Sequence, residues 1–210
     1  MIKVLIADDH AVVRRGLKQI LADTPDIVAG GEAAAAQDVM RLVRDERWNV
    51  VVLDISIPSA TGLELLADIR REKPDLPVLV LTAYPEDQYA VRAIRAGAAG
   101  FLTKESAPEK LIEAIRKVAG GGRWVSAELA ETLASLLAGE AKGAPHERLS
   151  DREFEVMKML ASGKTVSQIA DELALSVKTV STHRTRILKK MNMKTNAELM
   201  RYAVQAGLVL

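Results

Sequence analysis

The stretch Val50-Val51-Val52-Leu53-Asp54 is an apolar run of four residues that ends in a carboxylate. The same pattern recurs in three further segments, Val4-Leu5-Ile6-Ala7-Asp8-Asp9, Val78-Leu79-Val80-Leu81-Thr82 and Ala98-Ala99-Gly100-Phe101-Leu102-Thr103-Lys104. Each apolar run is long enough for a strand and too short for a helix. Strands that are apolar nearly throughout are typical of parallel sheets whose two faces are both covered by helices. The sequence therefore predicts an α/β fold.

Segments with helical spacing of apolar residues alternate with the predicted strands. A short additional strand is predicted at residues 27–29, and helices are predicted at residues 12–21, 34–46 and 62–71. Two more helices are expected to begin at Pro85 and Pro108, each with acidic residues in its first turn. Five strand–helix units with short connections predict a flavodoxin-like (βα)5 domain over residues 1–119, with right-handed crossovers.

The remainder of the chain is predicted to be helical. Gly120-Gly121-Gly122 ends the fifth helix, and a linker is predicted over residues 120–145, with a helix near 126–137 and a flexible segment at 139–145. A second domain, small and all-α, is predicted over residues 146–210. It opens with a capping box at Ser150 and Glu153. Its four helices are expected at residues 151–162, 166–173, 177–192 and 196–206.

The bulk composition excludes several classes of protein. The chain of 210 residues has no cysteine, which excludes disulfides, thiolate zinc sites and Cys nucleophiles. No apolar run approaches the roughly 20 residues needed to cross a bilayer, and the start of the chain has no signal-peptide pattern. We therefore expect a cytoplasmic protein that makes no contact with a membrane.

Charge is distributed unevenly along the chain. Residues 1–145 carry 18 Lys and Arg against 21 Asp and Glu, whereas residues 146–210 carry 11 against 7. Between Lys178 and Lys194 there are six basic residues and no acid. A basic C-terminal part favours a polyanionic partner. A solvated amphipathic helix and a surface that binds another protein are also compatible with these charges.

The polar residues that follow the strands are expected to lie close together. The carboxyl ends of parallel strands share one edge of the sheet, where open α/β folds bind their ligands. The carboxylates of Asp8, Asp9 and Asp54 would repel one another there, and a hard cation such as Mg2+ would relieve the repulsion. A carboxylate in such a site can attack phosphorus, while a Thr hydroxyl and a Lys ammonium contact the phosphoryl group. Taken singly, each residue is also compatible with a turn, a helix cap or a solvated charge.

Together these segments resemble the receiver domain of bacterial response regulators. The resemblance rests on Leu5-Ile6-Ala7-Asp8-Asp9-His10, Val52-Leu53-Asp54-Ile55-Ser56-Ile57-Pro58 with Gly62, Leu81-Thr82-Ala83, and Gly97-Ala98-Ala99-Gly100-Phe101-Leu102-Thr103-Lys104. It implies that Asp54 accepts phosphate from a sensor histidine kinase. It also implies that Asp9, Asp54 and the backbone carbonyl of Ser56 bind Mg2+ directly, with Asp8 acting through water.

The resemblance assigns the remaining residues of the site as well. Thr82 and Lys104 would contact the phosphoryl group, and Phe101 would occupy the switch position of the family, although it is equally compatible with core packing. The chain departs from many receivers at Glu105, which stands where they have a cis proline. Ser56 and Tyr84 occupy positions that flank the phosphate and vary in the family.

The C-terminal part resembles the LuxR-type helix-turn-helix of the NarL/FixJ subfamily. The resemblance rests on Leu149-Ser150-Asp151-Arg152-Glu153, Gly163, Gln168-Ile169-Ala170, Leu175-Ser176, Lys178-Thr179-Val180, His183, Ile187, Lys190 and Met191. It implies that the helix near residues 177–192 is the recognition helix. Residues expected at bases are Ser181, Thr182 and Thr185, and those expected at phosphates are Lys178, Thr179, His183, Arg186 and Lys190. The last helix resembles the dimer contact of the family, although Tyr202 and Val204 are also compatible with packing inside the domain.

The predicted function is that of a two-component response regulator rather than an enzyme. Phosphorylation of Asp54 would promote homodimerisation and binding to double-stranded DNA at promoters, with at most self-phosphorylation and self-dephosphorylation as chemistry. One alternative is a Mg-dependent phosphatase that forms an aspartyl phosphate, although Ser56 stands where such an enzyme needs a second acid. The other is a receiver whose helical tail binds protein instead of DNA.

Overall fold

The computed structural model of the chain describes residues 1–57, 62–138 and 144–209. The chain divides into two compact units, Met1–Ala134 and Ser135–Leu210. Pro58 and most of the predicted flexible segment at 139–145 lie outside the described residues. Within the described part of the chain, no helix is long and apolar enough to cross a membrane.

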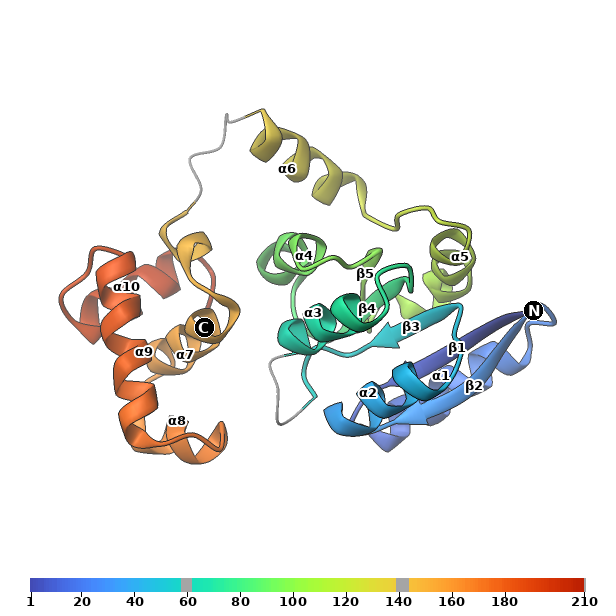
Figure 1. Ribbon diagram of the computed structural model, residues 1–210. Helices are drawn as coiled ribbons and strands as arrows, with labels where there is room; N and C mark the ends of the chain where they lie inside the picture. Colours follow the sequence, from blue (N-terminus) through green and yellow to red (C-terminus); the bar gives the residue numbers. More distant parts are fainter. Residues whose placement is uncertain (58–61, 139–143, 210) are drawn as a thin grey trace. The chain divides into compact units, whose positions relative to one another are not determined.

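The first unit is built on a five-stranded parallel sheet with the order β2-β1-β3-β4-β5 (Figure 1). The strands are β1 (Ile2–Ala7), β2 (Ile27–Ala33), β3 (Val50–Leu53), β4 (Val78–Thr82) and β5 (Gly100–Thr103). This arrangement confirms the predicted flavodoxin-like α/β fold. Because β1 and β3 are neighbours at the centre of the sheet, the residues that follow them are brought together.

Strand β2 extends four residues beyond its predicted end at Ala29. The register of its pairing with β1 shifts, since Val4 pairs with Ala29 but Leu5 pairs with Gly31. A Cβ at Gly31 would lie 2.5 Å from the ring of Trp48, so the backbone approaches this ring closely. Glycines normally interrupt a strand pattern. Here Gly30 and Gly31 lie at a β-bulge, and Gly31 also allows the backbone to lie against the Trp48 ring.

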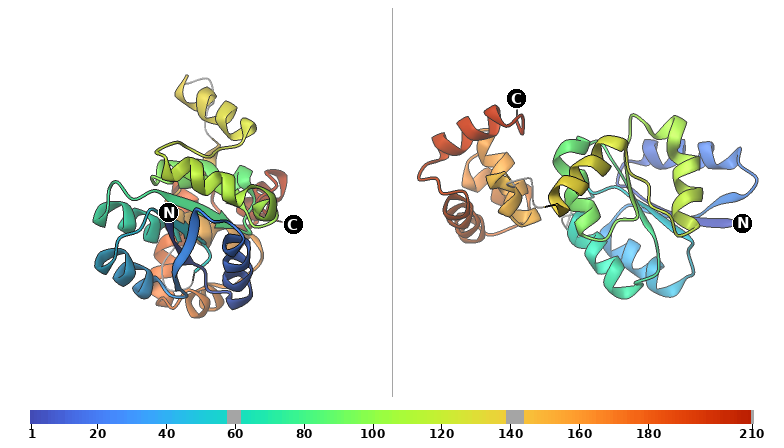
Figure 2. Two further views of the ribbon diagram at one scale, coloured as in Figure 1. Left: turned by 90° about the vertical axis from the view of Figure 1, so that its right-hand side faces the viewer. Right: turned by 90° about the horizontal axis from the view of Figure 1, so that it is seen from above.

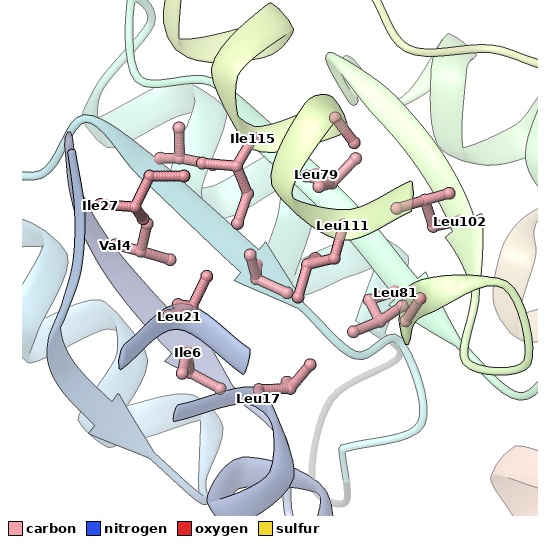
Figure 3. Packing of buried hydrophobic residues seen from close by; sticks show 14 of the residues in the cluster. Val4, Ile6, Leu17, Leu21, Ile27, Leu79, Leu81, Leu102, Leu111 and Ile115 are labelled. Carbon is pink, nitrogen blue, oxygen red and sulfur yellow. The ribbon is translucent and has the colours of Figure 1, made fainter. Parts of the chain in front are cut away.

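Five helices cover the two faces of the sheet. They are α1 (Ala11–Ala22), α2 (Ala36–Asp45), α3 (Gly62–Glu72), α4 (Glu86–Arg95) and α5 (Ala107–Ala119). Figure 2 shows α1 and α5 on one side of the sheet and α2 and α3 on the other. Leu17 and Leu21 of α1 pack with Leu111 and Ile115 of α5 against the strands (Figure 3), and all four are at most 5% exposed. This core fixes the strand ends that carry the polar residues.

The chain beyond α5 continues to pack on the sheet. The backbone N–H of Trp124 donates to Ala99 O at 3.0 Å, and that of Phe101 donates to Trp124 O at 3.0 Å, so this segment covers the edge of β5. Ser126 then caps the predicted helix, observed as α6 (Ala127–Leu137), by accepting from Leu129 N at 3.0 Å. Residues up to Ala134 that we predicted to form a linker therefore belong to the first compact unit.

The second unit contains the four predicted helices, preceded by a short 3-10 turn η1 (Pro145–Arg148). The helices are α7 (Asp151–Ala161), α8 (Val166–Glu172), α9 (Val177–Lys190) and α10 (Asn196–Gln205). The predicted capping box is present, because Ser150 Oγ accepts from Glu153 N and Glu153 Oε2 accepts from Ser150 N. Phe154, Met157, Val180, Ile187 and Leu199 form a core in which each is at most 1% exposed.

Glycine is required where α3 begins, at Gly62, and not at Gly16 within α1. A Cβ at Gly62 would overlap backbone atoms of Ile55, whereas a Cβ at Gly16 would meet nothing within 4 Å. We expect Gly62→Ala to lower the free energy of unfolding of the first unit by about 1–3 kcal/mol, as overpacking does. The control Gly16→Ala should raise it by up to about 1 kcal/mol because Ala favours a helix. Urea unfolding followed by Trp48 and Trp124 fluorescence measures both, and equal values for the two variants would contradict the prediction.

Candidate functional site

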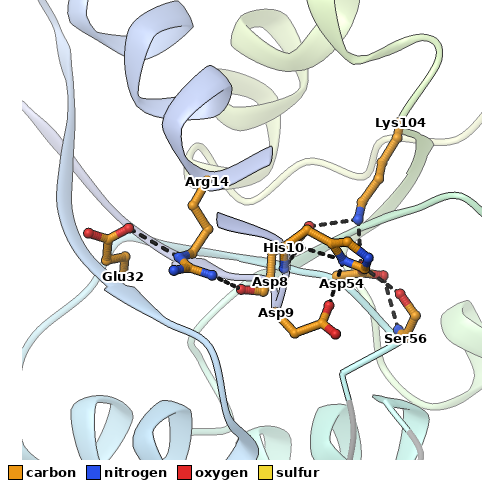
Figure 4. A network of polar contacts seen from close by, with 8 residues as sticks. All are labelled: Asp8, Asp9, His10, Arg14, Glu32, Asp54, Ser56 and Lys104. Atoms are coloured by element: carbon orange, nitrogen blue, oxygen red, sulfur yellow. Dashed lines mark hydrogen bonds and ion pairs between the residues drawn. The ribbon is translucent and has the colours of Figure 1, made fainter. Parts of the chain in front are cut away.

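The predicted acidic residues meet at the carboxyl edge of the sheet (Figure 4). Asp8 and Asp9 follow β1, and Asp54 follows β3. The backbone N–H of Asp54 donates to Ala7 O at 2.8 Å. The hydrogen bonds between β1 and β3 therefore fix the position of Asp54 relative to Asp8 and Asp9. Together with His10, the three acids offer four ligand atoms that all lie within 4.8 Å of one another.

Asp54 is 1% exposed, and both of its carboxylate oxygens accept hydrogen bonds. Ser56 N donates to Oδ1 at 3.0 Å, while Ser56 Oγ and Lys104 Nζ each donate to Oδ2 at 2.6 Å. Lys104 Nζ also lies 2.7 Å from Asp8 Oδ2. Burial lowers the pKa of Lys104, but the hydrogen bonds to Asp54 and Asp8 outweigh this effect and raise the pKa above its usual value. The ammonium is therefore charged and lies between two carboxylates.

The loop that carries Asp8 and Asp9 is held by a basic residue that the sequence did not single out. Arg14 donates to the backbone carbonyl of Asp8 at 2.7 Å, and its Nε lies 3.2 Å from Glu32 Oε2 on β2. His10 N donates to Asp8 Oδ1 at 2.8 Å. Spacing along the chain gives no signal for the contact between Arg14 and Glu32, because it depends on how α1 lies against β2.

The donor set fits a hard divalent cation. Asp8 Oδ2 and Asp9 Oδ1 are buried atoms, and each has one nitrogen beside it, Lys104 Nζ and His10 Nδ1 respectively, at 2.7 Å. Buried carboxylate oxygens need a positive partner. Asp8, Asp9 and Asp54 supply the oxygen ligands that Mg2+ prefers.

Thr82 ends β4 and is fully buried. Its carbonyl accepts from Lys104 N at 2.8 Å, which ties together the two strand ends that carry the predicted phosphoryl-binding residues. Its hydroxyl oxygen accepts from Tyr84 N at 3.3 Å. Phe101 is 2% exposed, with its backbone paired to Trp124. In this structure Phe101 is a core residue of β5.

The second unit places α8 and α9 in a helix-turn-helix. Ala174 adopts a left-handed conformation with φ of 51°, Leu175 N donates to Ala170 O at 2.8 Å, and Ser176 caps α9 by accepting from Thr179 N. Helix α9 turns Val180, Ile187 and Leu188 inward. Seven of the eight predicted contact residues are exposed, namely Lys178, Thr179, Ser181, Thr182, Thr185, Arg186 and Lys190.

The hydroxyl groups on α9 have defined orientations. Thr182 Oγ1 donates to Lys178 O at 2.9 Å, and Thr185 Oγ1 donates to Ser181 O at 3.0 Å. Because each hydroxyl proton is already used within the helix, these oxygens remain acceptors for a donor outside it. The remaining predicted residue, His183, is half-buried, and its Nδ1 is a buried atom without a hydrogen bond among the described residues.

Lys190 makes a structural contact that the sequence did not predict. Its Nζ lies 2.6 Å from Oε2 of Glu153, the acid of the capping box. Glu153 is 4% exposed, and burial raises its pKa, but Lys190 and the backbone of Ser150 lower the pKa by more. The Lys190 ammonium therefore neutralises a buried carboxylate, and a phosphate would have to compete with Glu153 for it.

Comparisons with known proteins bear on both units. Residues 4–116 match the response regulator receiver domain, and residues 147–203 match bacterial regulatory proteins of the luxR family. Response regulator GacA of Pseudomonas aeruginosa is 38% identical over 210 residues, which is 100% of this chain and 98% of the relative. Response regulator UvrY of Escherichia coli is 37% identical over 209 residues, which is 99% of this chain and 96% of the relative. The chain belongs to the NarL/FixJ family of response regulators.

Solved structures of family members resemble both parts of this response regulator. RcsB from Salmonella enterica serovar Typhimurium, bound to the promoter rprA in the presence of the phosphomimetic BeF3−, has a TM-score of 0.67 and 26% identity, covering 96% of this chain and 98% of that one. ChrA of a heme-sensing two-component system is 31% identical over 99% of this chain and 98% of that one, with a TM-score of 0.52. The predicted family is confirmed.

Proposed function

We propose that Asp54 is the phosphoacceptor of this response regulator. The observation that carries the proposal is the buried Asp54 carboxylate, held by Ser56 and Lys104 beside Asp8 and Asp9. An oxygen of Asp54 attacks phosphorus, and the P–N bond of the phosphohistidine of a sensor kinase breaks as the imidazole leaves. The Lys104 ammonium then balances charge on the phosphoryl oxygens.

Mg2+ would be held directly by Asp9, Asp54 and the backbone carbonyl of Ser56, with Asp8 acting through water. When bound, the metal neutralises charge on the phosphoryl group during transfer. After transfer, Thr82 donates its hydroxyl proton to a phosphoryl oxygen. Phe101 on β5 is the residue expected to change position when Asp54 is phosphorylated. A phosphatase is disfavoured because Ser56, two residues after Asp54, already donates to Asp54 and is too weak an acid to protonate a leaving group.

Replacing the phosphoacceptor should abolish phosphorylation. We expect Asp54→Asn to show no incorporation of phosphate from acetyl phosphate with Mg2+ present, because an amide is not a nucleophile toward phosphorus. The control Asp45→Asn, at an exposed carboxylate on α2, should be phosphorylated like the wild type. Intact mass spectrometry measures the fraction phosphorylated. Undiminished incorporation in Asp54→Asn would mean that another residue is the acceptor.

We propose that α9 enters the major groove of double-stranded DNA and that the phosphorylated chain binds paired half-sites as a homodimer. Ser181, Thr182 and Thr185 present small hydroxyl groups that can reach base edges. Side chains expected at phosphates are Lys178, Thr179, His183, Arg186 and, in competition with Glu153, Lys190. The similar RcsB structure is a complex with promoter DNA, which supports DNA rather than a protein partner for this unit.

Exchanging single residues on α9 separates these roles. We expect Lys178→Ala to weaken binding to all DNA sequences similarly, whereas Thr182→Ala should change the preferred base at one position. The control Lys164→Ala removes a lysine whose ammonium lies 2.6 Å from Glu172, and this variant should bind DNA like the wild type. Selection from a random DNA library, followed by affinity measurement over a range of salt, tests this. Equal effects of Lys178→Ala and Thr182→Ala, or affinity independent of salt, would contradict the proposal.

We further propose that the signal leaves the phosphorylation site through the start of α4. The Thr82 hydroxyl now accepts from Tyr84 N, and turning it toward Asp54 breaks this bond. The ring of Tyr84 stacks on that of Tyr89 in α4, with centroids 4.4 Å apart. In the first turn of α4, Glu86 accepts from Ser126 Oγ, the cap of α6, at 2.5 Å. Movement of Thr82 therefore reaches the helix that leads toward the DNA-binding unit.

Removing the contact between Ser126 and Glu86 should uncouple α6 from phosphorylation. In the wild type we expect phosphorylation to increase amide hydrogen exchange in the first turn of α6. In Glu86→Ala, which removes this contact and keeps the cap that Ser126 Oγ provides to Leu129 N, the turn should respond little to phosphorylation. The control Thr132→Ala removes only a bond within α6, from Thr132 Oγ1 to Glu128 O, and should respond like the wild type. A response in Glu86→Ala equal to that of the wild type would show that the signal takes another route.

A further inference from the structure

We propose that His10 is a metal ligand in the acidic site, so that this receiver binds borderline divalent transition metals through nitrogen and oxygen. The proposal rests on the Mg2+ site proposed above and adds one ligand to it. The class of cation is that of Mn2+, Co2+ and Zn2+, for which imidazole is a favoured donor. The His10 nitrogen would join Asp9, Asp54 and the Ser56 carbonyl, with Asp8 acting through water. Ligand atoms of His10 and the three acids all lie within 4.8 Å of one another.

The position of the His10 ring carries the proposal. Its Nδ1 lies 2.7 Å from Asp9 Oδ1 and 3.4 Å from Asp8 Oδ1. Metal–nitrogen and metal–oxygen bonds of about 2.0–2.2 Å place adjacent ligands of an octahedral ion about 3 Å apart. The separation of Nδ1 from Asp9 Oδ1 is close to this value. A metal could therefore enter between them with a small movement of the exposed ring.

Hydrogen bonds of the loop fix the backbone from which the His10 ring extends. His10 is the residue that precedes α1, and its N–H donates to Asp8 Oδ1 at 2.8 Å. Arg14 holds the Asp8 carbonyl in the same loop. The His10 side chain is 61% exposed, so it is open to a metal arriving from solvent and does not contribute to the core. Its side chain makes no capping hydrogen bond to α1, so its removal should leave the helix intact.

The simpler explanation is a hydrogen bond or ion pair between His10 and Asp9. The two explanations differ in what they predict for metals of different softness. A ring that only contacts Asp9 affects Mg2+ and transition metals alike, because it acts on the shared carboxylate. A ring that binds metal strengthens the binding of transition metals selectively, because Mg2+ prefers oxygen ligands.

Calorimetric titration of the full chain with MgCl2 and with CoCl2 distinguishes them. We expect His10→Ala to weaken Co2+ binding by about tenfold or more, in line with the loss of a metal-site group, while Mg2+ binding changes by less than about twofold. The visible absorption of the Co2+ complex should also change. His183→Ala removes an imidazole in the other unit and serves as the control, with Co2+ binding at this site unchanged.

Two outcomes overturn the inference. Co2+ affinity and absorption of His10→Ala equal to those of the wild type would show that the ring only contacts Asp9. Parallel weakening of Mg2+ and Co2+ would show that it acts through Asp9. Asp9→Asn tests the underlying site separately, because it should weaken both metals. Undiminished Mg2+ binding in Asp9→Asn would instead contradict the proposed Mg2+ site itself.

Discussion

The repulsion among Asp8, Asp9 and Asp54 is the constraint on which the first unit depends. Two of these carboxylates are at most 2% exposed, so water cannot stabilise their charges. Lys104 supplies a cation from the end of β5, with its Nζ 2.6 Å from Asp54 and 2.7 Å from Asp8. In the sheet, β3 and β4 lie between β1 and β5, so Lys104 reaches Asp8 across two intervening strands. Folding and charge balance are therefore linked across the whole sheet.

The same constraint bears on the switch that we propose for this site. Lys104 contacts both Asp54 and Asp8, and the buried Thr82 hydroxyl accepts a hydrogen bond from Tyr84 N. A phosphoryl group on Asp54 would add negative charge beside Lys104, whose ammonium already pairs with both Asp54 and Asp8. The surrounding groups must then rearrange, and those that can do so most readily are the ones held by single hydrogen bonds. Thr82 is such a group, whereas the Asp54 backbone is fixed by the sheet ladder.

The sequence was sufficient for the fold and for the acidic site because both depend on residues adjacent to strands. Apolar runs that end in Asp8, Asp54 and Thr82 indicate the strands, the sheet edge at which they end, and the polar groups that meet there. It was insufficient where contacts join distant segments without a local pattern. The pairing of Trp124 with β5 and the bond between Ser126 and Glu86 follow from how the chain returns over the sheet. The extension of β2 falls outside the predicted strand because adjacent glycines normally interrupt a strand pattern.

The second unit also contains a buried carboxylate that is neutralised by a lysine. Glu153, the acid of the capping box at Ser150, is 4% exposed, and Lys190 at the C-terminal end of α9 neutralises it. Lys190, which we predicted to contact DNA, thus also holds α9 to α7. This contact draws positive charge away from the C-terminal end of the recognition surface. In the proposed complex, binding to DNA would then depend more on Lys178 and Arg186, which are exposed on α9.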